Sequence, residues 1–136
     1  MMSYSQLLKE AFKATRNSYA PYSRFRVGAA LLTDEGEVVT GCNVENASYG
    51  LSNCAERTAV FRAVSMGRRR FKAIAVVSSK VNPVYPCGAC RQVLREFNPG
   101  LTVVVADGRG RPLTTTLERM LPNSFGPESL RRKRGR

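Results

Sequence analysis

The sequence contains no histidine, and this absence excludes several kinds of functional site. Without an imidazole, the chain cannot form a Ser-His or Cys-His nucleophile pair, and it cannot bind zinc through nitrogen ligands. Any metal site must instead be made from thiolates and carboxylates. The chain has four cysteines for this purpose.

Long apolar segments are also missing. No segment approaches the roughly 18 to 20 apolar residues that a membrane span needs. The first twenty residues lack the apolar core and the cleavage-like site of a signal peptide. We therefore expect a soluble, cytoplasmic protein. Its 136 residues, of which 43% are hydrophobic, suit one domain with a buried core.

Acidic residues are few in comparison with basic ones. The chain has 22 lysines and arginines against 10 acidic residues, which gives a net charge of +12. Such a charge can attract phosphate groups, but a solvated basic surface is the more common explanation, and no nucleic-acid partner is expected. We predict a single domain over residues 1–127 and a flexible basic tail over residues 128–136. Residues 122–136 show no regular pattern.

Hydrophobic periodicity predicts helices and strands that alternate along the chain. A first helix is indicated by apolar residues at helical spacing, namely Leu7, Leu8, Ala11, Phe12 and Ala14. Strands are predicted at residues 26–33, 38–44, 71–79, 101–107 and 112–116. Further helical segments are predicted at residues 53–64, 89–97 and 117–121, the first of them with Asn53 as its N-cap. This alternation is typical of an α/β fold in which helices cover one sheet.

The cysteines form a pattern that ordinary packing does not explain. Cys54 and Glu56 stand two positions apart in NCAERTA, and Cys87 and Cys90 form a Cys-x-x-Cys pair in PCGAC. Both clusters fall at the beginning of predicted helices, where the helix dipole stabilises negative charge and lowers thiol pKa values. Two such helix N-termini, pointing at one place, would bring three thiolates together.

Three thiolates suit a catalytic zinc ion. Zinc prefers four ligands, so three cysteines leave one position open for water, which is typical of catalytic rather than structural sites. Glu56 need not be a ligand and can lie beside this water as an acid and base. Cys42 lies in a predicted strand, away from any helix start, and we interpret it as an ordinary buried residue.

Each of these features also has a simpler explanation. A Cys-x-x-Cys pair in an α/β protein can be a redox pair, and Cys54 alone can be a small buried residue. Glu56 can be a first-turn carboxylate that the helix dipole favours. Tyr22, Phe25 and Tyr49 can be packing residues. The occurrence of Cys-x-Glu together with Cys-x-x-Cys favours the metal site.

These segments, taken together, resemble one known family. CAE and PCGAC resemble the zinc nucleoside and nucleobase deaminase superfamily, whose three-cysteine form uses a glutamate that is not a ligand. The segments YSRFRVGAAL, GCNVENAS, CAERTA, PCGACRQ and LPNSFGP are similar to those of the short, homotetrameric cytidine deaminases. The resemblance covers residues 4–127. It implies a three-layer α/β/α fold around a central mixed sheet of about five strands.

The resemblance implies a metal centre and a reaction. Cys54, Cys87 and Cys90 would hold one zinc ion per chain, and its hydroxide would attack C4 of cytidine or 2′-deoxycytidine. Glu56 would take a proton from the zinc water, deliver it to the ring nitrogen N3, and help to protonate the leaving amino group. Ammonia and uridine or 2′-deoxyuridine would be released, as part of pyrimidine salvage.

The resemblance also implies the substrate contacts. Asn43 and Glu45 would bind the ribose hydroxyls, the backbone amide of Ala55 would bind the pyrimidine carbonyl, and Phe25 would stack near the base. A carboxylate at the ribose suits a hydroxyl donor and repels a phosphate, which points to nucleosides rather than nucleotides.

Residues from neighbouring subunits are implied as well. Phe125 would close the active site of another subunit, and Tyr49 would also serve across an interface, so a homotetramer with shared active sites is expected. Arg57 would hydrogen-bond to the zinc thiolates and offset their excess negative charge, which restores the acidity of the metal's water. Gln92 would support the same metal environment.

Three alternative functions stay open at this level. A blasticidin-type aminonucleoside deaminase shares Cys-x-Glu and PCxxC, although the NVENAS and LPNSFGP segments favour cytidine. A polynucleotide cytosine deaminase would need room for a long chain, which Glu45 and Phe125 argue against. A non-enzymatic zinc module that binds nucleic acid would need a fourth protein ligand, for which Cys42 is badly placed.

Overall fold

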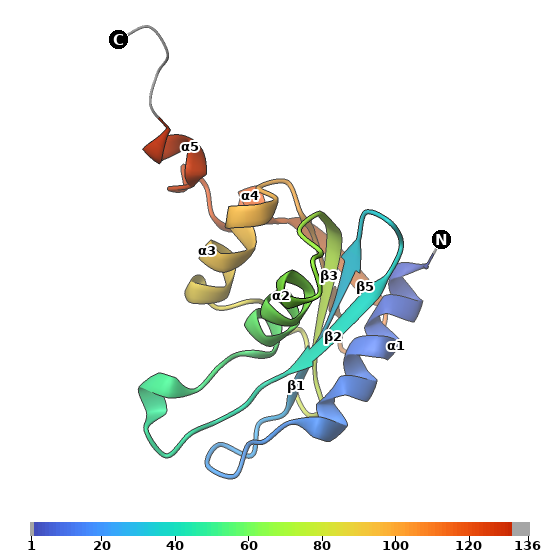
Figure 1. The fold of residues 1–136 in the computed structure, drawn as a ribbon. Coiled ribbons are helices and arrows are strands. Elements are labelled where there is room, and N and C mark those ends of the chain that lie inside the picture. Colours follow the sequence, from blue (N-terminus) through green and yellow to red (C-terminus); the bar gives the residue numbers. More distant parts are fainter. Residues whose placement is uncertain (1, 132–136) are drawn as a thin grey trace, which may run out of the picture.

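The computed structural model describes residues 2–131 and shows one mixed five-stranded sheet (Figure 1). The strand order is β2 (Val38–Cys42), β1 (Val27–Thr33), β3 (Phe71–Ser78), β4 (Thr102–Ala106) and β5 (Pro112–Thr116). β1 is antiparallel to both β2 and β3, β3 is parallel to β4, and β4 is antiparallel to β5. The predicted α/β fold with a mixed sheet is confirmed.

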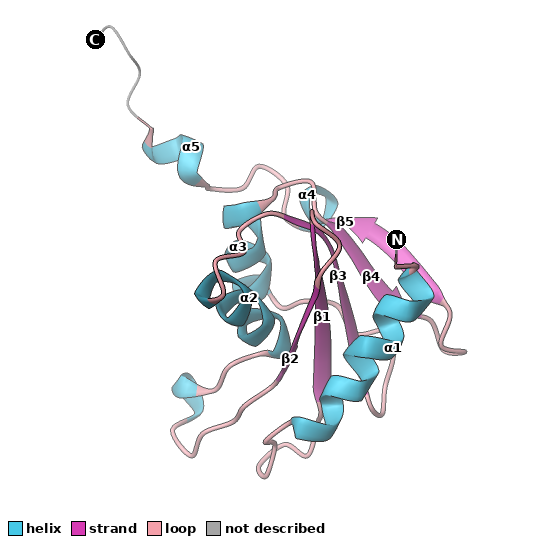
Figure 2. Cartoon of the chain, turned by 45° about the vertical axis from the view of Figure 1, so that its right-hand side comes forward, coloured by secondary structure: helices cyan, strands magenta, loops and turns pink. Residues whose placement is uncertain are grey.

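Helices cover both faces of this sheet. α1 (Tyr4–Ala14) lies on one face, whereas α2 (Ala55–Ser65) and α3 (Gly88–Phe97) lie on the other (Figure 2). Two further helices of four residues each, α4 (Leu117–Met120) and α5 (Pro127–Leu130), follow β5, and single 3₁₀ turns occur at Thr15–Asn17 and Tyr49–Leu51. α1 begins with a capping box between Ser3 and Gln6, which satisfies amide groups at its first turn.

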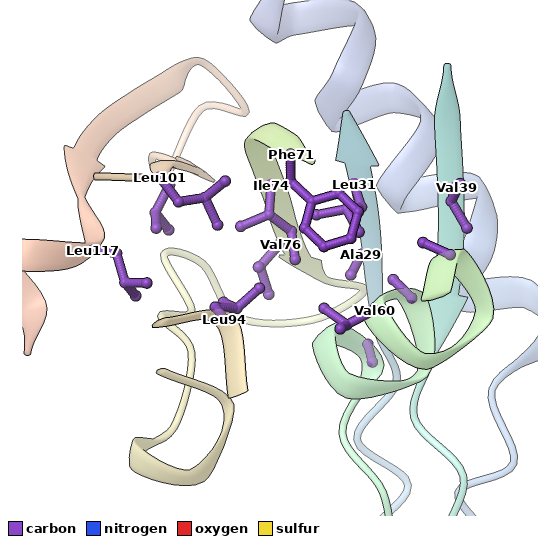
Figure 3. Packing of buried hydrophobic residues seen from close by; sticks show 14 of the residues in the cluster. Ala29, Leu31, Val39, Val60, Phe71, Ile74, Val76, Leu94, Leu101 and Leu117 are labelled. Carbon is purple, nitrogen blue, oxygen red and sulfur yellow. The ribbon is translucent and has the colours of Figure 1, made fainter. Parts of the chain in front are cut away.

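The core is divided by the sheet into two apolar layers. Along β1, Ala29 and Leu31 point into the layer below α2 and α3, whereas Ala30 and Leu32 point into the layer below α1. Figure 3 shows the first layer, in which Phe71 and Val60 pack against the central strands. Because both faces are covered, the central strands are apolar throughout and hold the loops at their ends firmly.

Two glycines allow the helices to approach the sheet closely. A Cβ atom at Gly41 in β2 would lie 2.4 Å from the backbone nitrogen of Ala59 in α2. On the opposite face, a Cβ atom at Gly28 in β1 would lie 1.9 Å from the carbonyl oxygen of Ala11 in α1. Backbone atoms cannot move aside as flexible side chains can. These two positions therefore determine how deeply each helix packs.

Two predicted details of the fold are wrong. The N-cap of α2 is Cys54 rather than Asn53. The backbone of Asn53 instead pairs with that of Val44, and its side-chain Nδ2 donates to the Thr58 hydroxyl. The C-terminal segment is not irregular throughout, because α5 forms within it. Residues 132–136 of the predicted tail lie outside the described residues, so its flexibility stays a prediction. Within residues 2–131, no helix is long and apolar enough to cross a membrane.

We predict that Gly41→Ala and Gly28→Ala each lower the free energy of unfolding by about 2 kcal/mol or more, because the new methyl group overlaps helix backbone. Denaturant unfolding of each variant, compared with the wild type, measures this loss. Gly108→Ala is the matched control, since no atom lies within 4 Å of its added Cβ. Equal stability of all three variants would contradict the prediction.

Candidate functional site

Three cysteines meet at the N-termini of α2 and α3. Cys54 is the N-cap of α2, Cys87 is the N-cap of α3, and Cys90 lies in the first turn of α3. The Sγ atoms of Cys54 and Cys87 are 3.8 Å apart, and those of Cys87 and Cys90 are 3.5 Å apart. All three sulfur atoms lie within 4.8 Å of one another, although residue 54 is separated from the others by α2 and β3.

The spacing of the sulfur atoms fits a zinc ion. Zinc binds cysteine sulfur at about 2.3 Å in tetrahedral sites, which places two ligand sulfurs about 3.8 Å apart. The separations found here are close to that value, and all three cysteines are free of disulfides. Cys90 is buried whereas Cys87 is exposed, so the cluster is closed on one side and open on the other. Cys42, predicted to be buried, is only half-buried and belongs to β2.

The thiols perturb one another strongly. The pKa of Cys54 is lowered to about 5, first by its hydrogen bond with Cys90 and further by hydrogen bonds with Arg57 and Cys87. The pKa of Cys90 is raised, first by the same hydrogen bond and then by burial. The two thiols therefore titrate as one coupled pair, in which the Cys54 thiolate is favoured over the Cys90 thiolate.

Arg57 lies against the sulfur cluster, as predicted. Its Nη2 donates to the Sγ of Cys54 at 3.4 Å. The pKa of Arg57 is raised, first by this hydrogen bond, so it stays charged beside the sulfurs. Its Nε is buried and has no hydrogen-bond partner among the described residues. The guanidinium group thus supplies positive charge next to a thiolate cluster.

Glu56 is the buried carboxyl group of the site. It occupies the first turn of α2, and only 4% of its surface is exposed. Burial raises the pKa of this carboxyl to about 7. This effect outweighs the lowering of the pKa by a backbone hydrogen bond and by the charge of Arg57. A group with such a pKa can both hold and release a proton near neutral pH, which is what a general acid and base must do.

Cys54 and Cys87 line a cleft of about 490 Å³, whereas the buried Cys90 is not among its lining residues. Nine of its lining residues were predicted to belong to the site: Phe25, Asn43, Glu45, Tyr49, Cys54, Ala55, Glu56, Arg57 and Cys87. Ala55 is buried and is the first residue of α2. Its amide N–H is one of the first four in the helix, which have no hydrogen-bond acceptor within the helix. Such an amide can donate to a ligand.

Other lining residues were missed by the sequence analysis: Ser23, Val27, Ser52, Asn53, Val76, Val84 and Tyr85. Val84 and Tyr85 directly precede PCGAC, so their closeness to Cys87 was a usable signal. Val76 belongs to β3 and appears in the sequence only as part of a buried strand. Ser23 stands within the YSRFRVGAAL segment, but nothing in that segment indicates what its hydroxyl contacts.

Asn43 and Glu45 lie in this cleft and hold its wall together. The Nδ2 of Asn43 donates to the carbonyl of Phe25 at 2.7 Å, and its Oδ1 accepts from the amide of Val27 at 2.9 Å. The Oε1 of Glu45 accepts from the amides of Tyr22 at 3.0 Å and Ser23 at 3.1 Å. Hydrogen bonds with Ser23 lower the pKa of Glu45, so it is ionised at neutral pH.

Phe125 and Gln92 are not among the lining residues of the chain's own cleft. The Nε2 of Gln92 donates to the carbonyl of Phe125 at 2.9 Å, and the ring of Phe125 is 59% exposed. The neighbouring Arg95 is buried, donates to the hydroxyl of Ser124 at 2.7 Å and forms an ion pair with Glu128. α3 therefore anchors a segment that presents an exposed phenylalanine.

Comparisons with known proteins agree with this site. Residues 1–106 match the family model described as the cytidine and deoxycytidylate deaminase zinc-binding region. The cytidine deaminase of Sporosarcina psychrophila is 49% identical over 130 residues, which cover 95% of this chain and 96% of that protein. That of Halalkalibacterium halodurans is 52% identical over 130 residues, covering 95% of this chain and 98% of that protein.

Solved structures show the same likeness. The crystal structure of cytidine deaminase from Burkholderia pseudomallei has a TM-score of 0.86 and 51% identity, and the match covers 91% of this chain and 100% of that chain. The crystal structure of cytidine deaminase from Mycobacterium tuberculosis has a TM-score of 0.81 and 44% identity, with 93% of this chain and 99% of that chain covered.

The raised pKa of Glu56 predicts how pH affects the stability of metal-depleted protein. The folded state binds the proton of Glu56 more tightly than the unfolded state does. The contribution of this proton to the free energy of unfolding is therefore complete below about pH 4.5 and is lost as the pH rises to about 7. Glu56→Gln cannot ionise and should gain stability relative to the wild type over this range, by on the order of 3 kcal/mol.

Unfolding of both proteins at pH 5 and pH 8, in the presence of a chelator, measures this difference. Saturation with zinc should reduce it, because a nearby cation favours the carboxylate. A stability difference that is the same at both pH values would show that Glu56 has an ordinary pKa.

Proposed function

The chain belongs to the zinc-binding cytidine and deoxycytidylate deaminase family and has cytidine deaminase activity, and we propose that Glu56 carries the protons of this hydrolysis. The substrates are cytidine and 2′-deoxycytidine, and the reaction serves pyrimidine salvage in the cytoplasm. One observation supports this most directly: three sulfur atoms lie within 4.8 Å of one another, and two of these cysteines, Cys54 and Cys87, line the same cleft as the buried Glu56.

Cys54, Cys87 and Cys90 are the residues that hold the zinc ion. When bound, zinc supplies the Lewis acidity that makes water a nucleophile near neutral pH. Three thiolates outweigh the two charges of the metal and would reduce that acidity. Arg57 offsets the excess through its hydrogen bond to the Sγ of Cys54 at 3.4 Å.

Glu56 moves the protons of the reaction. It takes one proton from the attacking water and delivers it to N3 of the cytosine ring while the water oxygen bonds to C4. It then takes the remaining proton from the hydroxyl on C4 and transfers it to the amino group, so that the C4–N bond breaks. Ammonia leaves, and the base becomes uracil. Burial places the pKa of this carboxyl at about 7, so that neither the acid nor the base form is costly to reach.

Asn43 and Glu45 bind the sugar through the hydrogen-bonding groups that their contacts within the protein leave free. One Nδ2 hydrogen of Asn43 is used by the carbonyl of Phe25, so the second is available as a donor. The Oε1 of Glu45 accepts two amide hydrogens, whereas its Oε2 accepts only from Ser23 and keeps one lone pair. A nucleoside hydroxyl can accept the free hydrogen of Asn43 and donate to the free lone pair of Glu45. The carboxylate repels a 5′-phosphate.

The base is held by the other side of the cleft. The amide of Ala55, at the N-terminus of α2, donates to the pyrimidine carbonyl, and the ring of Phe25 stacks near the base. Both residues line the cleft beside Cys54 and Cys87. This arrangement directs the exocyclic amino group toward the metal and Glu56.

The functional unit is a homotetramer in which neighbours complete each active site. Phe125 is 59% exposed and Tyr49 is 75% exposed, although hydrophobic rings are normally buried. Gln92 and Arg95 hold the segment of Phe125 against α3, so that its ring is presented outward. An aromatic ring that is exposed but well anchored is typical of a contact with another subunit.

We predict that Glu56→Gln retains about one zinc ion per chain and lowers kcat with cytidine by a factor of about 10² to 10⁴, because the amide cannot transfer protons. Metal analysis and ammonia release measure the two quantities. Cys87→Ser should lose zinc as well as activity, whereas Glu118→Gln, on the exposed surface of α4, should change neither. A fully active Glu56→Gln would exclude this residue as the proton carrier.

Blasticidin S and single-stranded DNA are the competing substrates for the same zinc-loaded protein. Faster turnover of either one than of cytidine would reassign the substrate without changing the metal chemistry.

We further predict that Phe125→Ala lowers kcat/KM with cytidine by about tenfold, through loss of a contact to a neighbouring site. Joint refolding of Phe125→Ala and Glu56→Gln chains should produce some sites with both residues intact, and activity should exceed that of either variant. No gain on mixing would show that Phe125 acts within its own chain.

A further inference from the structure

The hydroxyl of Ser23 lies between two parts of the cleft that bind different parts of a nucleoside. Its Oγ donates to Oε2 of Glu45, the sugar-binding carboxylate, and accepts from the amide of Phe25 at 3.0 Å. Neither its position in the sequence nor the zinc chemistry calls for a hydroxyl here. We propose that Ser23 is a positioning residue, which locks Glu45 and Phe25 into one hydrogen-bonded unit and so increases the affinity for the nucleoside.

The peptide units around Phe25 are held from both sides. The amide of Phe25 donates to Ser23 Oγ, and its carbonyl accepts from Nδ2 of Asn43 at 2.7 Å. Phe25 lies shortly before β1 and Asn43 directly after β2, at the open end of the β1–β2 hairpin, and both residues line the cleft. Because Ser23 and Asn43 contact the amide and the carbonyl of the same residue, the backbone of Phe25 is coupled to the sugar-binding groups.

Glu45 is held in a similar way. Its Oε1 already accepts from the amides of Tyr22 and Ser23, so only Oε2 has a lone pair left for a ligand. The Ser23 hydroxyl occupies the other lone pair of Oε2 and thereby orients the free one. The single hydrogen of this hydroxyl points to the Glu45 carboxylate, and its oxygen accepts from the amide of Phe25. These two contacts determine the orientation of the hydroxyl.

The backbone between these residues adopts a conformation that needs such support. Arg24 has a φ angle of 58°, in the left-handed region that L-residues rarely occupy. This residue connects Ser23 to Phe25, and its conformation allows the Ser23 hydroxyl to reach the amide two positions on. Strained residues of this kind persist where surrounding contacts hold them, and they are common in ligand sites.

This inference rests on the proposed assignment of Glu45 to the sugar. It predicts that Ser23→Ala raises KM for cytidine by about tenfold and leaves kcat within about twofold, because the lost contacts position the nucleoside and do not touch the reacting atoms. Ser23→Thr retains the hydroxyl and should restore KM to near the wild-type value. Ser5→Ala, in the first turn of α1 on the other face of the sheet, is the control for loss of a serine hydroxyl.

A double-mutant cycle distinguishes positioning from a general loss of structure. If Ser23 acts through Glu45, Ser23→Ala should have much less effect on KM in a Glu45→Ala background than in the wild type. Steady-state kinetics with the zinc-loaded proteins, together with their melting temperatures, provide the four values. Additive effects on KM, or a Ser23→Thr variant as impaired as Ser23→Ala, would overturn the inference.

The same kinetics separate this inference from the proposed function. A wild-type protein that does not deaminate cytidine would refute the function itself. An active wild type with an unchanged Ser23→Ala variant would refute only the role of Ser23. A Glu45→Ala variant with the wild-type KM would refute the assignment of Glu45 to the sugar, and with it the basis of the inference.

Discussion

The whole site depends on the convergence of two helix N-termini beyond one end of the sheet. α2 and α3 bring Cys54, Cys87 and Cys90 to within 4.8 Å of one another, and such close thiolates would repel if nothing compensated their charge. The positive ends of both helix dipoles and the guanidinium group of Arg57 provide this compensation, and a bound cation completes it. The position of α2 in turn depends on Gly41, where a larger residue would overlap the backbone at Ala59.

A second consequence of this arrangement is that Glu56 is buried beside the metal ligands. Burying a carboxyl group is unfavourable for its charged form, and this raises its pKa to about 7. The same burial that weakens the metal-depleted fold at neutral pH makes Glu56 suitable for proton transfer. Stability is thus reduced at the position where the proposed chemistry needs a group that titrates near neutral pH.

In the proposed binding mode, the two ends of the substrate are held by different kinds of structure. The base would lie near helix N-termini and a buried core, which are rigid because tertiary packing surrounds them. The sugar would lie against the loops before β1 and after β2, which extend beyond the same end of the sheet (Figure 1). Hydrogen bonds of Ser23, Asn43 and Glu45 replace packing there as the source of rigidity. The C-terminal segment is likewise held by polar contacts, from Gln92 and Arg95 on α3.

The sequence by itself determined the order of helices and strands, because hydrophobic periodicity reports burial directly. It also predicted the three-cysteine cluster and singled out Glu56, since Cys-x-Glu and Cys-x-x-Cys carry their chemistry within a few residues. Only the tertiary structure decided the rest. The N-cap of α2 is Cys54 rather than Asn53, and the hydrogen-bond partners of Ser23 and Arg95, which are Glu45 and Ser124, are distant from them in the chain. Spacing along the chain indicates which chemistry a residue can perform, whereas long-range tertiary contacts decide which partner it binds.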